Sequence, residues 1–485
     1  MTRSGSARIR ARVCLALALP ACLVIAAAGL AQPVRAATFL TVSTCDDSHL
    51  RAAVAQANSD NADDMIVFAC TGTISLTSTL DITGSMFINA SGAQVTLDGG
   101  SAMGVLNVAS GVTLKMTDLS VQNGSTTGDG GALYNAGTAN IYGGTFSDNS
   151  ASDGGALENS AGAAMSITGS TFTLNHAADS YRGGAVHNSG TMTITSSLFN
   201  SNCAGCTSGT GPSGGAIANG GTMSISASTF YQNRADNGGG GAIWASTSTS
   251  TSVTNSSFTL NHAAAGGAIE SQRGTTNINF STFWNDSAGN GSGNEIAGKA
   301  SILGSVLTSQ GSSNCAAFFV DQGYNMESGT DCGFTHTGDL QNANPGIGQE
   351  ANLSLYLAQG SPGIDAVPAG LCPVTDQNGN ARPDDPAETS CDMGAAESAY
   401  PPPVVLSSSA DPSAYGQPVT FTATVAPTDG GGTVAFYEDN SATPISGCGI
   451  QPLTQVSGST YSATCTTTPI SAETHAITAS YSGDS

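Results

Sequence analysis

The sequence predicts an all-β protein: a right-handed parallel β-helix with an N-terminal capping helix, followed by a β-sandwich. Two interleaved repeats carry the β-helix prediction. The tripeptide Gly-Gly-Ala occurs six times, each time before Leu, Val or Ile, at spacings of 24 to 31 residues. A fixed period of this length is the signature of a solenoid. The six copies begin at Gly130, Gly154, Gly183, Gly214, Gly240 and Gly266.

The second repeat is Phe-x-x-Asn. Coils that stack about 4.8 Å apart would place its phenylalanines in one buried stack and its asparagines in one hydrogen-bonded ladder. The Gly-Gly pairs would then form tight corners with positive φ. The phenylalanines are Phe146, Phe172, Phe199, Phe230, Phe258 and Phe283, and the ladder residues are Asn149, Asn175, Asn202, Asn233 and Asn261, with Asp286 breaking the series.

Residues 1–36 read as a secretory signal peptide. A basic start precedes an apolar run from Val13 to Ala31, and Val34-Arg35-Ala36 resembles a cleavage site. An uncleaved membrane anchor is the alternative. No other segment reaches the roughly 18 apolar residues that a transmembrane span needs.

A capping helix is expected where the mature chain begins. Leu50, Ala53, Val54 and Ala57 recur at helical spacing, so one face of this segment is apolar. A helix there would cover the open backbone edge of the first coil. We assign residues 37–309 to the cap and the β-helix.

Ten cysteines remain after cleavage, an even number that suggests disulfides in a secreted chain. Cys203 and Cys206 have the spacing of a redox motif or half a zinc site, but no second such pair completes a zinc site. The expected disulfides are the local pairs Cys45–Cys70, Cys203–Cys206, Cys315–Cys332, Cys372–Cys391 and Cys448–Cys465.

The repeat dissolves after residue 309. Residues 310–398 are non-repetitive, and residues 399–403 form a stiff, Pro-rich linker. Residues 404–485 contain short alternating strands separated by turns, which predicts a β-sandwich. No obvious last strand follows, so we expect this domain to be incomplete or the chain to be a fragment of a longer protein.

The charge of the chain argues against polyanionic partners. The signal segment holds five of the 12 Lys and Arg, leaving seven against 35 acids and a formal charge of −28. Binding to nucleic acid or anionic membranes needs clustered cations, so neither is expected as a partner. The same charge disfavours anionic polysaccharides.

The two repeats together resemble those of the polymorphic outer-membrane protein family, over about residues 130–285. That resemblance implies a surface-exposed β-helical protein, often adhesive. Residues 310–398, with Ser361-Pro362-Gly363-Ile364-Asp365 among their motifs, resemble the choice-of-anchor segment that ends many secreted β-helices. Residues 404–485 look like a bacterial Ig-like repeat, which makes the expected sandwich Ig-like.

An enzyme is the rival interpretation, because parallel β-helices also host polysaccharide lyases and glycosidases. The seven mature cations are scattered along the sequence, and a glycosidase needs two acids about 5–10 Å apart. The acids Asp129, Asp153, Asp179 and Asp236 precede Gly-Gly pairs, where Asp is an ordinary turn residue. We therefore expect no catalytic residue.

One variable column offers a candidate binding surface. The residue after each Gly-Gly-Ala-aliphatic motif should point outward, and stacked coils would align these residues in a strip. Its aromatics could stack on sugar rings while its acids bind hydroxyls, which suggests a cell-surface glycan or a protein receptor as partner. A variable solvated face is the alternative. The column consists of Tyr134, Glu158, His187, Ala218, Trp244 and Glu270.

Asp376, Asn378 and Asn380 match the first ligand positions of a Ca²⁺ loop, but Ala381 stands where such loops need glycine. A plain polar turn is the alternative, and no other cofactor is expected.

Taken together, the sequence predicts a secreted, surface-displayed, non-catalytic and adhesin-like protein. A β-helical polysaccharide-degrading enzyme remains the alternative.

Overall fold

The computed structural model describes residues 37–482, apart from the short segments given next. The segments left out are 60–61, 179–181, 207–210, 212, 247–248, 273, 310–312, 317–318, 385–388, 399–403, 426–431, 440, 458–459 and 468–473. The predicted signal peptide and the predicted Pro-rich linker lie outside the described residues.

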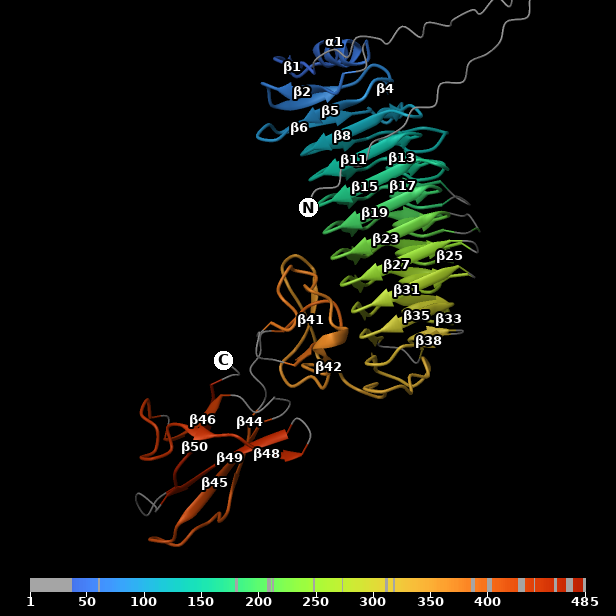
Figure 1. Ribbon diagram of the computed structural model, residues 1–485. Coiled ribbons are helices and arrows are strands. Elements are labelled where there is room, and N and C mark those ends of the chain that lie inside the picture. Colours follow the sequence, from blue (N-terminus) through green and yellow to red (C-terminus); the bar gives the residue numbers. More distant parts are fainter. Residues whose placement is uncertain are drawn as a thin grey trace, which may run out of the picture. The chain divides into compact units, whose positions relative to one another are not determined.

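The main body is a parallel β-helix whose coils stack along one axis (Figure 1). Its described strands form four parallel sheets, which we call A to D. Each regular coil visits them in the order A, B, D and C before it returns to A. The prediction of an all-β parallel solenoid is confirmed.

Sheets A and B are the longest. Sheet A contains β1 (Phe39–Val42), β2 (Asp64–Phe68), β5 (Met86–Asn89), β8 (Thr113–Thr117), β11 (Thr138–Tyr142), β15 (Ala164–Thr168), β19 (Thr191–Thr195), β23 (Thr222–Ser226), β27 (Ser250–Thr254), β31 (Thr275–Asn279), β35 (Ala300–Leu303) and β38 (Phe319–Asp321). Sheet B contains β3 (Gly72–Ser75), β6 (Val95–Asp98), β9 (Leu119–Gln122), β12 (Thr145–Ser147), β16 (Thr171–Thr173), β20 (Leu198–Asn200), β24 (Thr229–Tyr231), β28 (Ser257–Thr259), β32 (Thr282–Trp284), β36 (Val306–Thr308) and β39 (Met326–Glu327).

Sheets C and D complete the coil. Sheet C contains β4 (Leu80–Ile82), β7 (Leu106–Val108), β10 (Leu133–Asn135), β14 (Leu157–Asn159), β18 (Val186–Asn188), β22 (Ile217–Asn219), β26 (Ile243–Ala245), β30 (Ile269–Ser271), β34 (Ile296–Gly298) and β37 (Cys315–Ala316). Sheet D contains β13 (Ser150–Ala151), β17 (His176–Ala177), β21 (Cys203–Ala204), β25 (Arg234–Gly239), β29 (His262–Ala265) and β33 (Ser287–Ser292).

The phenylalanine column forms the predicted stack in the core. All six rings are fully buried, and neighbouring rings are nearly parallel, with centroids 4.6 to 4.9 Å apart. That distance matches the spacing of neighbouring strands, because each ring lies on sheet B directly opposite the ring of the next coil.

The asparagine column forms the predicted ladder. Each Nδ2 donates to the Oδ1 one coil further along, as Asn175 does to Asn202 at 2.9 Å. The last asparagine, Asn261, donates to Asp286 at 2.8 Å. A second buried ladder runs through sheet C, where Asn135, Asn159, Asn188 and Asn219 are joined by bonds of 2.8 Å. This second ladder is not among the features that the sequence analysis predicts.

The Gly-Gly pairs form the predicted corners, and each of the two positions requires glycine for a different physical reason. The first of each pair has a positive φ, for example 63° at Gly240. The second glycine has no room for a side chain, because a Cβ on Gly241 would lie 2.1 Å from the carbonyl oxygen of Gly267 in the next coil.

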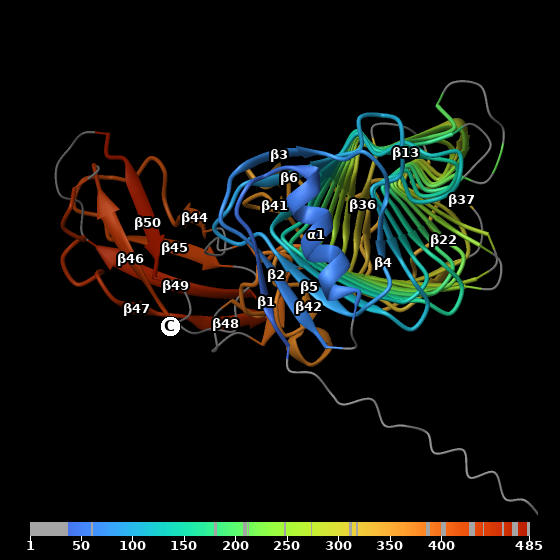
Figure 2. The same cartoon turned by 90° about the horizontal axis from the view of Figure 1, so that it is seen from above.

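The N-terminal cap is the helix α1 (Asp47–Ala57). Its N-cap, Asp46, accepts a hydrogen bond from the backbone N–H of His49 at 2.9 Å. The four residues of the predicted apolar face are buried, against the strands β1, β2 and β4. Figure 2 shows α1 lying across the end of the first coils, which confirms the predicted cap.

All five predicted disulfides are formed. The bond between Cys203 and Cys206 closes a short loop that begins in sheet D, as the structural-disulfide prediction requires, and the bonded sulfurs are not free to ligate zinc.

The segment after the coils folds back onto sheet B. Its short elements are β40 (Ile347–Gln349), β41 (Leu355–Leu357), β42 (Val367–Pro368), the 3₁₀ turn η1 (Ala369–Leu371) and β43 (Ser390–Cys391). Gln377 donates to the Thr229 hydroxyl at 2.8 Å, and the N–H of Ala395 donates to the Thr282 hydroxyl at 2.8 Å. Between them, the N–H of Leu355 donates to the Ser257 hydroxyl of β28 at 2.9 Å, so the segment is bonded to three successive strands of sheet B.

The C-terminal residues form a two-layer antiparallel module. One sheet contains β44 (Val404–Ser408), β45 (Val419–Val425), β49 (Thr460–Thr467) and β48 (Thr454–Ser457), and the other contains β47 (Gln451–Pro452), β46 (Thr433–Glu438) and β50 (Ile477–Tyr481). The buried core between them includes Ala423, Val434, Phe436 and the disulfide of Cys465.

Candidate functional site

The predicted binding column lies where the sequence placed it, on the side of sheet C that faces away from the core. Its members are aligned in register from coil to coil. The expected exposure is wrong, however. Trp244 is only 4% exposed, Glu158 and His187 are about as covered, and Ala218 is fully buried. Tyr134 and Glu270 are half-buried.

Chain that returns from sheet D covers part of this column. The strand β25 runs up to Gly239, and the carboxylate of Glu270 lies directly against that glycine, where a Cβ would overlap it. Burial raises the pKa of Glu270. The column therefore lies between sheet C and the turns that lead into the Gly-Gly pairs. The Trp244 ring is not exposed, so it cannot stack on a ligand at the surface.

A buried, hydrogen-bonded pair of a histidine and a glutamate occupies the middle of the column. His187 Nδ1 lies 2.8 Å from Glu158 Oε2 and 3.9 Å from Asp153 Oδ2. Asp153 also accepts from the backbone N–H of Arg182 at 2.7 Å, which fits its predicted turn role. Burial raises the pKa of Glu158, the bond from His187 opposes that rise, and the negative charge of Asp129 adds to it.

This pair has the form of a carboxylate-oriented histidine, an arrangement used for proton transfer. Among the described residues, however, His187 Nε2 and Trp244 Nε1 are both buried and have no hydrogen-bond partner. They flank Ala218 on neighbouring coils. The sequence analysis predicts a turn at Asp153 and an outward-facing column that is either a binding surface or a solvated face, so it does not bring these groups together.

The proposed Ca²⁺ ligands form a hydrogen-bonded turn. Asp376 Oδ1 accepts the N–H groups of Asn378 and Asn380, each at 2.8 Å. Its Oδ2 accepts the Asn380 amide and the N–H of Glu397. Four donors satisfy this carboxylate, which favours the polar-turn alternative. Calcium binding stays a prediction.

Two departures from the repeat meet inside the last coils. Asp286 stands in the asparagine ladder, and Glu295 stands where earlier repeats carry the buried alanine of Gly-Gly-Ala. Both are buried, and neither Asp286 Oδ2 nor the Glu295 carboxyl oxygens have a donor among the described residues. Burial raises the pKa of Asp286 to about 7 and that of Glu295 well above its usual value, and the negative charge of Asp286 adds to the second rise. Two neighbouring buried carboxyls with raised pKa values are expected to share a proton.

This acid pair predicts that stability falls as the pH rises. A raised carboxyl pKa means that the folded state binds more protons than the unfolded chain between about pH 4 and the folded pKa of about 7, so unfolding becomes easier across that window. We expect Asp286→Asn to flatten the dependence and to stabilise the protein at pH 8 by about 1–3 kcal/mol. Urea unfolding at pH 5, 6.5 and 8 measures this. The exposed Asp148, changed to Asn, is the control, and an unchanged pH slope in Asp286→Asn would contradict the shared proton.

A second buried charge network fixes the C-terminal segment. Arg382 is buried, donates to the carbonyls of Asp392 and Gly394 at 3.0 and 2.7 Å, and lies 3.3 Å from Glu397. Burial and the charge of Asp392 raise the pKa of Glu397 to about 9. The guanidinium also lies over the ring of Phe280, 5.3 Å from its centroid. The contact with Phe280 joins the segment to the last coils.

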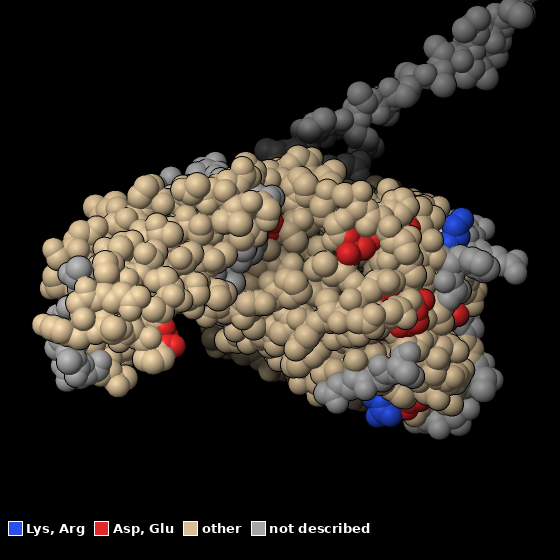
Figure 3. Space-filling model, turned by 90° about the horizontal axis from the view of Figure 1, so that it is seen from below, with Lys and Arg blue, Asp and Glu red and all other residues tan. Residues whose placement is uncertain are grey.

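The surface carries few cations. On the face shown in Figure 3, Lys and Arg appear at isolated places, and acids appear at several others between uncharged atoms. The face shows no basic patch. No helix among the described residues is long and apolar enough to cross a membrane.

Comparisons with known families match two parts of the chain. Residues 227–246 match the Chlamydia polymorphic membrane protein repeat, and residues 406–485 match the bacterial Ig-like domain (group 3). The class of protein is therefore a parallel β-helix with an appended Ig-like domain. More particularly, the chain is a polymorphic-membrane-protein-like β-helix, and this repeat suggests a surface protein.

Two solved structures share a distant likeness. An arginine-to-alanine mutant of the PL6 family alginate lyase AlyGC matches with 13% identity and a TM-score of 0.34, over 66% of this chain and 55% of the lyase chain. The major cedar pollen allergen Jun a 1 matches with 13% identity and a TM-score of 0.23, over 66% of this chain and 84% of the allergen. At these scores neither likeness indicates a shared active site. No curated protein matches the chain.

Proposed function

We propose that this chain is a secreted, surface-displayed β-helix that acts by binding at the bacterial cell exterior, in the manner of an adhesin. The match of residues 227–246 to the polymorphic membrane protein repeat carries this proposal. The Ig-like match supports it, because a β-sandwich appended to a rod is a natural spacer or contact module.

The repeated residues have structural roles, which is consistent with a scaffold. The invariant positions of each unit build the Phe stack, the Asn ladders and the glycine corners. None of these groups is left to act on a ligand. With seven cations against 35 acids in the mature chain, the ligand would be a neutral or cationic surface, such as a neutral glycan or a protein receptor.

Surface display and binding are tested separately. Protease treatment of intact cells should remove the protein, and the purified chain should bind neutral glycans or host-type receptor proteins without altering them. Tyr134, the half-buried aromatic of the column, tests the remaining part of the original binding hypothesis. Tyr134→Ala should weaken binding while leaving thermal unfolding unchanged. A chain protected from protease in intact cells would contradict surface display.

A polysaccharide-degrading enzyme is the second candidate, and the pair of His187 and Glu158 is the observation that favours it. Its test is release of reducing ends or unsaturated products from neutral and acidic polysaccharides. An enzyme would release products, and His187→Gln would abolish the release. An adhesin would bind without any product.

A further inference from the structure

The Ig-like module gathers three ligand-type side chains at one end of its three-stranded sheet. Glu438 is the last residue of β46 and pairs in register with Ile477 of β50, and His475 lies two residues before Ile477. Asp439 follows Glu438 and exchanges hydrogen bonds of 2.8 Å with the backbone of Ala476. The three side chains thus come from two adjoining strand ends.

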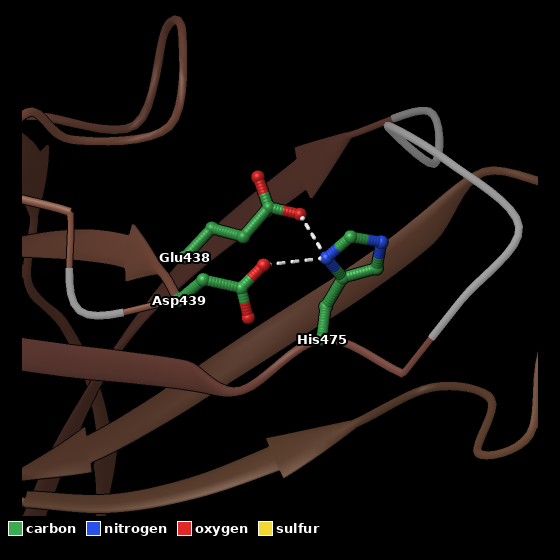
Figure 4. Close-up of side chains that lie close together, drawn as sticks. All are labelled: Glu438, Asp439 and His475. Carbon is green, nitrogen blue, oxygen red and sulfur yellow. Dashed lines mark hydrogen bonds and ion pairs between the residues drawn. The ribbon is translucent and has the colours of Figure 1, made fainter.

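Both carboxylates point at the same nitrogen (Figure 4). His475 Nδ1 lies 3.0 Å from Glu438 Oε1 and 2.8 Å from Asp439 Oδ2. Consecutive residues of a strand normally point to opposite faces. Here Asp439 leaves the strand with a φ of 49°, so the two carboxylates can converge.

The charges of the module are a separate observation that points to a cation. Residues 404–485 contain six acids and no Lys or Arg, and His475 is their one histidine. Two carboxylates therefore share a single imidazole, which supplies at most one positive charge. A divalent ion would balance the charge of both carboxylates, which one imidazolium leaves half compensated.

The cluster is also reachable from solvent. Glu438 and His475 form part of the wall of a hollow of about 450 Å³, whose other walls include Leu406, Phe421 and Ile477. The side chain of Asp439 is 52% exposed, whereas those of Glu438 and His475 are 18% and 16% exposed. The fold therefore holds the side chains of Glu438 and His475 in place, whereas the exposed side chain of Asp439 can adjust to an incoming ion.

We propose that Glu438, Asp439 and His475 form a binding site for a divalent transition-metal ion such as Zn²⁺. One imidazole nitrogen and two carboxylate oxygens suit Zn²⁺, which binds such ligands at about 2.0–2.2 Å. The three ligand atoms all lie within 4.8 Å of one another, so small side-chain rotations place them around one ion. Three protein ligands leave a fourth position for water or for a partner's carboxylate. Ca²⁺ is a poorer fit, since it takes about six to eight oxygens.

Calorimetric titration of ZnCl₂ into the full chain tests this site. Wild-type protein should bind Zn²⁺, and His475→Gln should weaken that binding at least tenfold. Asp439→Asn, at the exposed ligand, should weaken it several-fold and provides a second variant if His475→Gln fails to fold. His336→Gln, an exposed histidine in the segment after the coils, is the matched control and should bind as wild type does.

Several outcomes would overturn the proposal. These are no Zn²⁺ binding by the wild type, equal affinity in wild type and both site variants, or an equal loss in His336→Gln. A parallel titration with CaCl₂ distinguishes a transition-metal site from a calcium site. Tighter binding of Ca²⁺ than of Zn²⁺ at this site would also contradict a transition-metal site.

Discussion

Replacing Gly241 by alanine is expected to prevent normal stacking of the coils. The new Cβ would lie 2.1 Å from the carbonyl oxygen of Gly267 and 2.6 Å from the backbone nitrogen of His262. Both are backbone atoms held in the β-helix, so the clash cannot be relieved by turning a side chain. We expect a loss of at least about 3 kcal/mol of unfolding free energy or insoluble protein, measured by urea unfolding followed by circular dichroism.

The control separates crowding from backbone strain. Gly162 has a φ of 84° but no heavy atom within 4 Å of its Cβ position. Gly162→Ala should therefore cost only the left-handed strain of about 1–2 kcal/mol. Gly241 has no such positive φ, so its penalty comes from crowding alone. Equal stabilities of the two variants would contradict the assignment of the second glycine to close coil contact.

Replacing Phe230 by alanine is expected to destabilise the β-helix by about 3–5 kcal/mol. Its ring lies between those of Phe199 and Phe258, at 4.9 and 4.7 Å. Strand pairing on both sides fixes the two neighbouring rings at the coil spacing, so they cannot move together to fill the cavity. The midpoint of urea unfolding, with the slope held constant, measures the change.

Phe39 provides the matched control for the stack. It belongs to β1 of the same β-helix, but its side chain is 77% exposed. Phe39→Ala should change stability by no more than about 0.5 kcal/mol. If Phe230→Ala were as mild as Phe39→Ala, the stack would not be a main source of stability.

The periodic part of the fold could be predicted from the sequence. Residues that recur once per coil must stack on their own copies, so Phe172 and Asn175 each have a neighbour of the same type at about 4.8 Å. The cysteine pairs could also be predicted, because the partners of each pair are cysteines next to each other in the sequence and no more than 25 residues apart. The second ladder, at Asn188, was equally periodic and could have been found by the same reasoning.

Strain at the coil corners could not be predicted. The residue two places after each phenylalanine has a left-handed backbone, including Leu174 at a φ of 57° and Leu260 at 56°. Leucine is not a residue that favours this conformation. The hydrogen bonds of the neighbouring ladder fix the backbone there, and no local sequence signal reports it.

The candidate sites show the same difference between what a periodic pattern predicts and what depends on the packing of distant segments. Alternation along a strand correctly placed Trp244 and His187 on the side away from the core, but it cannot report what covers that side. His187, for example, lies 3.9 Å from Asp153, which follows the sheet D strand β13. The convergence of Glu438 and Asp439 on His475 likewise depends on one backbone angle and on the pairing of β46 with β50.

The solenoid, its repeat length, its buried columns, its disulfides and its cap can all be predicted from the amino-acid sequence, because each follows from a local period or a short spacing. Which polar groups are covered and which acids meet depends on how distant segments pack together. The meeting of Asp286 with Glu295 shows why: each is a lone departure from its own column. Burial of both carboxyls in one coil raises both pKa values, and neither column taken alone predicts this.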